Sequence, residues 1–181
     1  MSKDFPAKPT EAIVDSGANV PIVSRLFLDN FQRCIEEHYP DLRNRIHFNS
    51  SSMDLRVANG NSLRTSKNVS IPVKVDLTDK FTQTAFAVAD MKDCDVPFLL
   101  AMPQILALGG IIDSTPGREC LISRKYGFAY KLRRPQGHFL WDMMNSPMIK
   151  LDHIPQMLNI NWETFEKRTD HDNNKKQIGF S

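Results

Sequence analysis

The stretch Ile13-Val14-Asp15-Ser16-Gly17-Ala18 is the most informative part of this sequence. The apolar residues from Ala12 to Val14 predict a short buried strand. The polar residues after them predict a tight turn, because Asp and Ser bond to local backbone and Gly tolerates a positive φ. Val20–Val23 predicts a second short strand after the turn. The pattern therefore places the carboxylate of Asp15 at the end of a buried strand.

Asp15 is the candidate catalytic residue of a peptide hydrolase. Hydrolysis of a peptide bond without a metal or a covalent nucleophile needs a water molecule between two carboxylates that share one proton. Ser16 is placed to orient the carboxylate across to a partner loop, and Gly17 lets two such loops approach without a Cβ clash. Taken alone, the same tripeptide is also explained as an ordinary polar turn, so the elements around it decide between the two interpretations.

The sequence contains a single Asp-[Ser/Thr]-Gly tripeptide, and the nearest second match, Asp113-Ser114-Thr115, lacks the glycine. The chain has 181 residues. A two-lobed enzyme with duplicated halves needs roughly twice an ordinary domain of ~100–150 residues. The second carboxylate of such a site must therefore come from a second copy of the chain.

A helix and a hairpin are predicted after the first two strands. Residues 25–38 have apolar side chains at helical spacing, with Ser24 as the expected N-cap and Pro40 ending the helix. From Ile46 onward the apolar period changes to two, and Asn59-Gly60-Asn61 supplies the turn residues of a β-hairpin tip. The expected apolar face of the helix consists of Phe27, Phe31, Cys34, Ile35 and His38.

The second half of the chain predicts further short strands and one short helix. The strands are expected at Thr82–Val88, Val96–Leu100, Ile111–Asp113, Cys120–Ser123, Tyr126–Leu132 and His138–Met143. Pro103 opens the helix at Gln104–Leu108, and Gly109-Gly110 closes it. Many short strands with turn residues at intervals of about 8–12 residues predict a mainly β, barrel-like domain.

At these positions the sequence resembles the retropepsin-like aspartic proteases of retroviruses and retrotransposons. Residues 13–19 and Ile22-Val23-Ser24 are similar to their active-site strand and the strand after it. Residues 57–63 look like their flap hairpin, the cover over the substrate, and residues 98–113 look like their late core strand and helix. Residues 137–142 resemble the closing strand of some retrotransposon members. The resemblance covers about residues 11–143.

The resemblance implies a fold, a reaction and a site. The fold is a closed or partly open barrel with a flap hairpin, one helix inserted after the active-site strands and one short late helix. The reaction is that of a homodimeric aspartic endopeptidase, which processes a retroelement polyprotein or a host-adopted equivalent and binds it as an extended peptide. No metal or other cofactor is implied. The residues carried over are Asp15, Ser16 and Gly17 as catalytic, and Ala18, Asn19, Asn59, Gly60 and Asn61 as substrate-binding.

The chain departs from the family pattern after its late Leu-Leu pair. The family usually has Gly followed by a charged residue there, where this chain has Ala101 and Met102. The methyl group of Ala101 is tolerated if its φ is negative. Two other functions stay open: a catalytically silent retropepsin-fold module used for dimerisation or partner binding, and a monomeric β-barrel binding domain unrelated to proteases.

The composition argues against several other classes of protein. A net charge of +2 gives no strong field for a phosphate backbone, so direct nucleic-acid binding is not expected. No run of 18 or more apolar residues is present, so no membrane partner is expected. Cys34, Cys94 and Cys120 lack the paired spacing of a disulfide framework or, together with His138, of a zinc site. They predict free thiols and a cytoplasmic location.

The expected domain organisation has three parts. Residues 1–10 form an N-terminal arm, residues 11–143 the retropepsin-like domain, and residues 144–181 a C-terminal tail that is partly disordered. The tail is set apart by the break at Asn145-Ser146-Pro147 and by the polar run Thr169–Lys176.

Overall fold

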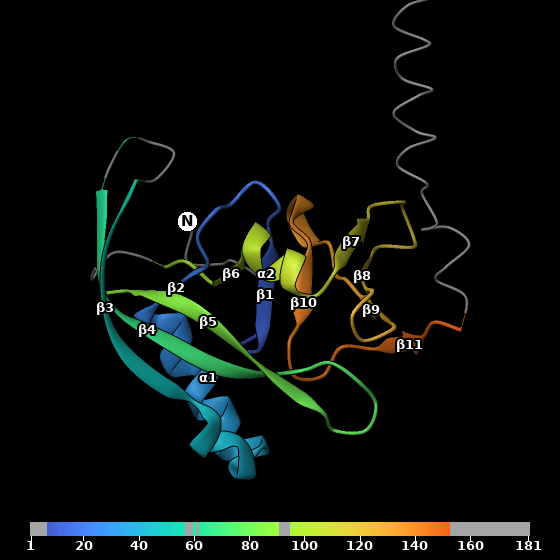
Figure 1. Cartoon of the computed structure of the whole chain (residues 1–181), viewed down its shortest axis with the longest axis horizontal. Helices are drawn as coiled ribbons and strands as arrows, with labels where there is room; N and C mark the ends of the chain where they lie inside the picture. The colour runs from blue at the N-terminus through green and yellow to red at the C-terminus, as the bar shows by residue number, and fades with distance from the viewer. Residues whose placement is uncertain (1–6, 57–59, 61, 91–94, 153–181) are drawn as a thin grey trace, which may run out of the picture. The chain divides into compact units, whose positions relative to one another are not determined.

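The computed structural model describes residues 7–56, 60, 62–90 and 95–152 (Figure 1). The chain divides into two units, residues 1–150 and 151–181, and every element below belongs to the first. The described part of this unit is mainly β, with two sheets, two α-helices and two 3₁₀ helices. The predicted mainly β class, with one helix after the first strands and a short late helix, is confirmed.

The larger sheet carries the stretch around Asp15. In spatial order its seven strands are β10 (Leu140–Asp142), β1 (Glu11–Val14), β6 (Phe98–Leu100), β2 (Ile22–Ser24), β5 (Phe81–Ala89), β4 (Ser62–Lys74) and β3 (His47–Arg56). β1 pairs in parallel with β6 and antiparallel with β10. β2 pairs in parallel with β5, and β3 and β4 form a long antiparallel hairpin (Figure 1). Asp15 follows β1 directly, and β1 lies between the edge strand β10 and β6.

The smaller sheet is antiparallel throughout. Its four strands lie in the order β11 (Met148–Lys150), β9 (Phe128–Lys131), β8 (Cys120–Ser123) and β7 (Gly110–Asp113). A barrel closes only when the first and last strands of a sheet pair. In the described residues, β3 does not pair with β10 and β7 does not pair with β11. The strands therefore form two open sheets, and the closed form of the predicted barrel is wrong.

The long helix α1 (Arg25–His38) begins and ends where the sequence predicts. Ser24 occupies the N-cap position, but its side chain makes no capping hydrogen bond and its buried Oγ has no partner in the described residues. The expected apolar face needs two corrections, because Leu28 is buried and His38 is exposed. The shorter helices are η1 (Pro40–Arg45), α2 (Met102–Ala107) and η2 (Pro135–Gly137).

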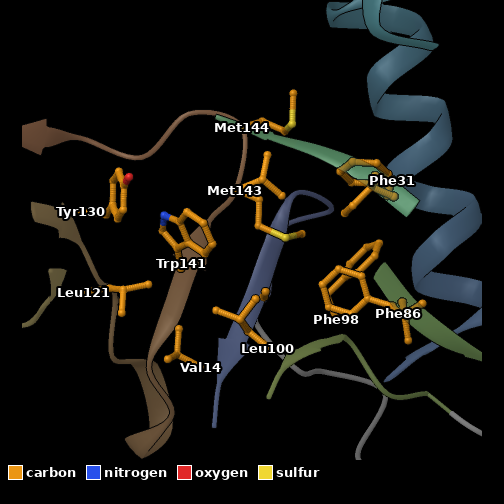
Figure 2. Close-up of a cluster of buried hydrophobic side chains, with 14 of the residues drawn as sticks. Val14, Phe31, Phe86, Phe98, Leu100, Leu121, Tyr130, Trp141, Met143 and Met144 are labelled. Carbon is orange, nitrogen blue, oxygen red and sulfur yellow. The ribbon is translucent and has the colours of Figure 1, made fainter. Parts of the chain in front are cut away.

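Aromatic and aliphatic side chains from both sheets and from α1 form the core (Figure 2). The ring of Phe98 packs edge-to-face on Phe31 at 5.1 Å and on Phe86 at 4.9 Å, which joins β6, α1 and β5. Val14 and Leu100 belong to the same cluster. Because Val14 precedes Asp15, the backbone that carries this carboxylate is anchored in the core.

The folded unit extends beyond the boundary that we predicted at residue 143. Met144 is buried in the core, and β11 pairs with β9 at Met148–Lys150. Lys131 N–H also donates to the carbonyl oxygen of Pro147. Residues 144–150 are therefore part of the first unit rather than of a tail. The expectation of partial disorder in the tail concerns residues 153–181, which lie outside the described residues.

Candidate active site

The loop that carries Asp15 is closed by backbone hydrogen bonds. Asp15 N–H donates to the carbonyl oxygen of Leu100 at 3.0 Å, and Ala18 N–H donates to the carbonyl oxygen of Asp15 at 3.2 Å. Gly17 N–H donates to Asp15 Oδ1 at 2.9 Å, so the turn itself orients the carboxylate. A Cβ at Gly17 would lie 3.2 Å from the same oxygen. Glycine therefore leaves room for the Asp15 carboxylate in this turn.

The segment from Leu100 to Met102 holds the other end of this loop. Met102 N–H donates to the carbonyl oxygen of Ala18 at 2.9 Å. Ala101, where the family usually has glycine, is fully buried and has a φ of −93°. Because this φ is negative, alanine adopts it without strain. The departure from the family pattern at this position is thus compatible with the local backbone.

A groove of about 590 Å³ opens beside the Asp15 loop. Asp15, Gly17, Ala18 and Asn19 line it, so the structure brings four of the predicted site residues to one surface. Ser16 is exposed on the same loop. The remaining lining residues are Val20, Ile22, Asp54, Leu55, Arg56 and Leu99. Most of these are apolar, and a carboxylate on one wall of an apolar groove is typical of a binding or catalytic site.

The β3–β4 hairpin forms a second wall of the groove, at residues 54–56 of β3. Leu55 pairs with Leu63 of β4 and packs against a small cluster that contains Ile22 and Ala89. This contact fixes the hairpin to β2 and β5 beside the groove. We did not predict residues 54–56 as site residues; the signal for them is their position just before the expected hairpin tip.

Gly60 is the described residue of the predicted hairpin tip Asn59-Gly60-Asn61. Gly60 is exposed and has a φ of +84°, which glycine adopts readily. A Cβ at Gly60 would meet no atom within 4 Å. The conformation of this residue therefore explains the glycine. Asn59 and Asn61, also predicted to bind substrate, lie outside the described residues.

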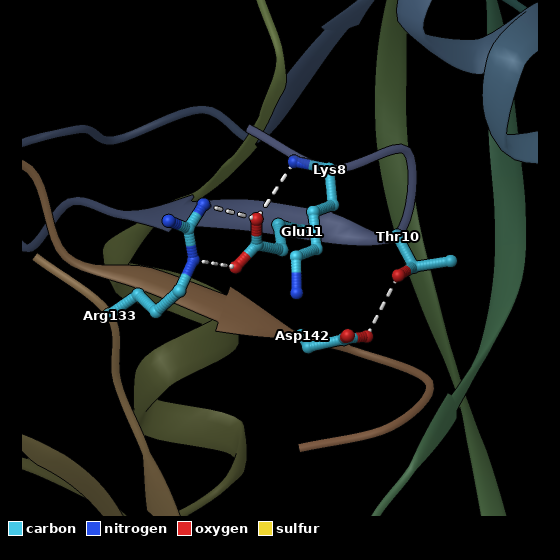
Figure 3. Close-up of polar contacts among 5 residues, drawn as sticks. All are labelled: Lys8, Thr10, Glu11, Arg133 and Asp142. Carbon is cyan, nitrogen blue, oxygen red and sulfur yellow. Dashed lines mark hydrogen bonds and ion pairs between the residues drawn. The ribbon is translucent and has the colours of Figure 1, made fainter. Parts of the chain in front are cut away.

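Polar contacts secure the start of β1, at the opposite end of the strand from Asp15 (Figure 3). Both oxygens of Glu11 accept hydrogen bonds from the guanidinium of Arg133, at 2.8 and 2.9 Å, and Lys8 N–H donates to Oε1 at 2.7 Å. Thr10 Oγ1 donates to Asp142 Oδ1 at 2.8 Å. Burial alone raises the pKa of Glu11, but the hydrogen bonds from Arg133 and Lys8 outweigh burial and hold its pKa below the usual range. Glu11 is therefore charged at neutral pH.

The predicted absence of a zinc site concerns Cys94, Cys120 and His138. Cys94 lies outside the described residues, within which no three His, Cys, Asp or Glu side chains are grouped as metal ligands. Cys34 and Cys120 are free thiols, as predicted, and burial raises the pKa of both. Both thiols are therefore protonated at neutral pH.

The chain was compared with protein-family models and with curated proteins. No protein-family model matches it, and neither does any curated protein. In the part of the chain that the structure describes, no helix has both the length and the apolar character needed to cross a membrane. The inference of function therefore rests on the residues and the geometry of the groove.

Proposed function

We propose that this protein is an aspartic endopeptidase of the retropepsin type that acts as a homodimer. The observation that carries the proposal is the groove between the Asp15 loop and the β3–β4 hairpin. It joins a carboxylate, a glycine that leaves room for it and an apolar surface in one place. These are the parts from which half of a two-carboxylate site is built.

The chemistry needs the Asp15 carboxylates of two protomers at the two-fold axis. Two carboxylates so close share one proton, because they cannot both ionise. The ionised one takes a proton from a water molecule, which attacks the peptide carbonyl carbon and forms a tetrahedral intermediate. The protonated one donates to the carbonyl oxygen, and proton transfer to the leaving nitrogen completes the cleavage. Ser16 orients the carboxylate across the dimer, and no covalent acyl-enzyme forms.

The substrate is an extended peptide that lies between the Asp15 loop and the hairpin. The backbone of such a peptide hydrogen-bonds like an added strand, and apolar side chains fit against Leu55, Leu99 and Ile22. A retroelement polyprotein or a host-adopted equivalent supplies such a peptide between its folded parts.

The decisive experiment incubates the full chain with a peptide library, with and without a transition-state-mimicking inhibitor of aspartic proteases. We expect cleavage that the inhibitor blocks and that Asp15→Asn reduces to background, because a neutral amide cannot act as the base. Asp54→Asn is the matched control, since Asp54 lines the same groove but lies on β3. Sedimentation should show a dimer for the wild type and for Asp15→Asn.

Three results would contradict the proposal. Cleavage that persists in Asp15→Asn excludes Asp15 as the catalytic residue. A dimer that cleaves no peptide in the library supports the catalytically silent module. A monomer at high concentration excludes a site shared by two chains.

A further inference from the structure

The side chain of Gln104, in the first turn of α2, makes two hydrogen bonds that the proposed chemistry does not use. Its Oε1 accepts from Ala101 N–H at 3.0 Å, and its Nε2 donates to the carbonyl oxygen of Ala85 in β5 at 2.8 Å. Ala101 is fully buried. The side chain of Gln104 therefore satisfies a buried backbone donor and at the same time ties α2 to β5.

The segment that Gln104 fixes is the one that holds the Asp15 loop. Leu100 accepts from Asp15 N–H, and Met102 N–H donates to Ala18. Ala101 lies between these two residues, and its N–H is bound by Gln104. A shift of this short segment would move the anchor points at the start and at the end of the loop together.

The second bond of Gln104 leads to the strand that follows the loop. Ala85 lies in β5, which pairs in parallel with β2. Ala87 N–H donates to the carbonyl oxygen of Pro21, just before β2, at 2.9 Å. Both sides of the Asp15 loop are thus connected through Gln104: the β1 side through the segment 100–102, and the β2 side through β5.

We propose that Gln104 is a positioning residue for Asp15. It acts through Ala101 and Ala85 and does not touch the substrate, and this role rests on the proposed function of the groove. A carboxylate that must lie within hydrogen-bond distance of its partner tolerates little displacement, because small misplacements of catalytic groups lower rates strongly. Loss of Gln104 is therefore expected to affect turnover more than substrate binding.

Two variants separate the two hydrogen bonds. Gln104→Met has a similar length and loses both bonds. Gln104→Glu keeps an acceptor for Ala101 N–H but, when ionised, cannot donate to Ala85. Gln104 and Ala85 line an open pocket of about 310 Å³, so a replacement side chain has room without displacing the core. Gln83→Met is the matched control: Gln83 lines the same pocket and donates to Arg45 and Ser70, away from the loop.

The experiment measures backbone amide exchange by NMR in the full chain and steady-state cleavage of a peptide substrate. In Gln104→Met we expect the backbone amides of Asp15 and Met102 to exchange at least about tenfold faster than in the wild type, as for the loss of one buried hydrogen bond. We expect kcat to be at least about tenfold lower than in the wild type, with KM within about threefold of the wild-type value. Gln104→Glu should lie between Gln104→Met and the wild type. Gln83→Met should match the wild type in both measurements.

Each outcome bears on the proposal. Wild-type exchange and kcat in Gln104→Met overturn it, and so do equal effects in Gln83→Met, which would show a general loss of stability. A third outcome is that the protein cleaves no peptide while Gln104→Met still shows faster amide exchange at Asp15 and Met102. This result supports the positioning of the Asp15 loop by Gln104, and it refutes the protease function separately.

Discussion

The two walls of the groove are held in different ways. β1, β2 and β6 have three or four residues each, and all of these residues except Leu99 are buried. β3 has ten residues, and none of them is buried. The wall that carries Asp15 is thus fixed by core packing, whereas β3 of the hairpin wall is fixed by backbone pairing with β4 and by the half-buried side chain of Leu55.

This difference fits the two tasks of the proposed site. A catalytic carboxylate must be held still, and strands packed in a core hold it best. A cover over the substrate must admit a long peptide, and a strand such as β3, which has no buried side chain, moves at lower cost. If the two walls divide these tasks, matched variants of the two walls should differ most in packing, less in charge and least in backbone conformation.

Side-chain packing gives the largest expected difference in unfolding free energy between variants of the two walls. Phe98 of β6 is fully buried between Phe31 and Phe86, so Phe98→Ala should lower the free energy of unfolding by about 3–5 kcal/mol. Phe48 of β3 is 43% exposed, and Phe48→Ala should cost less than about 1 kcal/mol. Urea denaturation of both variants measures the two losses. Equal losses would show that the hairpin wall is packed as firmly as the other wall.

Charged side chains give the next largest expected difference in unfolding free energy between the two walls. The side chain of Glu11 in β1 is 3% exposed and bonds to Arg133 at 2.8 Å, whereas Asp54 in β3 is 80% exposed and lies 3.9 Å from Arg64. Glu11→Gln should lower the free energy of unfolding by about 1–3 kcal/mol, because it removes the charge that both guanidinium hydrogen bonds from Arg133 reach. Asp54→Asn should have no measurable effect on stability. A larger loss in Asp54→Asn than in Glu11→Gln would reverse the comparison.

The same pair predicts a dependence on pH. The pKa of Glu11 is lowered in the folded protein, so the ionised form contributes stability above the unfolded pKa of about 4.3, and this contribution is lost as the pH falls through the folded value. The difference in unfolding free energy between wild type and Glu11→Gln should therefore be constant from pH 7 to about 5 and shrink below about 4. A difference that grows as the pH falls below 4 would refute the assignment.

Backbone conformation gives the smallest difference in stability. Gly60 has a positive φ and open space around it, so Gly60→Ala should lower the unfolding free energy by about 1–2 kcal/mol. Gly17→Ala should cost less than about 1 kcal/mol but lower the cleavage rate at least about tenfold, since the methyl group presses on Asp15 Oδ1. Unfolding and cleavage measurements on both variants check this contrast. A cleavage rate unchanged in Gly17→Ala would contradict it.

Local patterns in the sequence predicted most of the elements around the site. The bounds of α1 follow from helical spacing that ends before Pro40, and the turn after Val14 follows from its polar residues and glycine. The second strand was predicted at Val20–Val23, but β2 is formed by Ile22–Ser24. Val20 and Pro21 precede the strand, and Ser24 is its last residue. The site residues Asp15, Gly17, Ala18 and Asn19 were predicted from the motif that follows the first strand. The hairpin was predicted as the cover over the substrate, but its residues 54–56 were not predicted to line the groove.

The sequence by itself determined which segments form strands and helices and where the carboxylate lies, because these depend on residues a few positions apart. The tertiary structure alone decided what surrounds that carboxylate. It placed residues 54–56 across the groove, joined Glu11 to Arg133 and Gln104 to Ala85, and extended the folded unit to Lys150. These contacts join residues far apart in the chain. Their free energy comes from burial and hydrogen bonding that exist only once the sheet has formed.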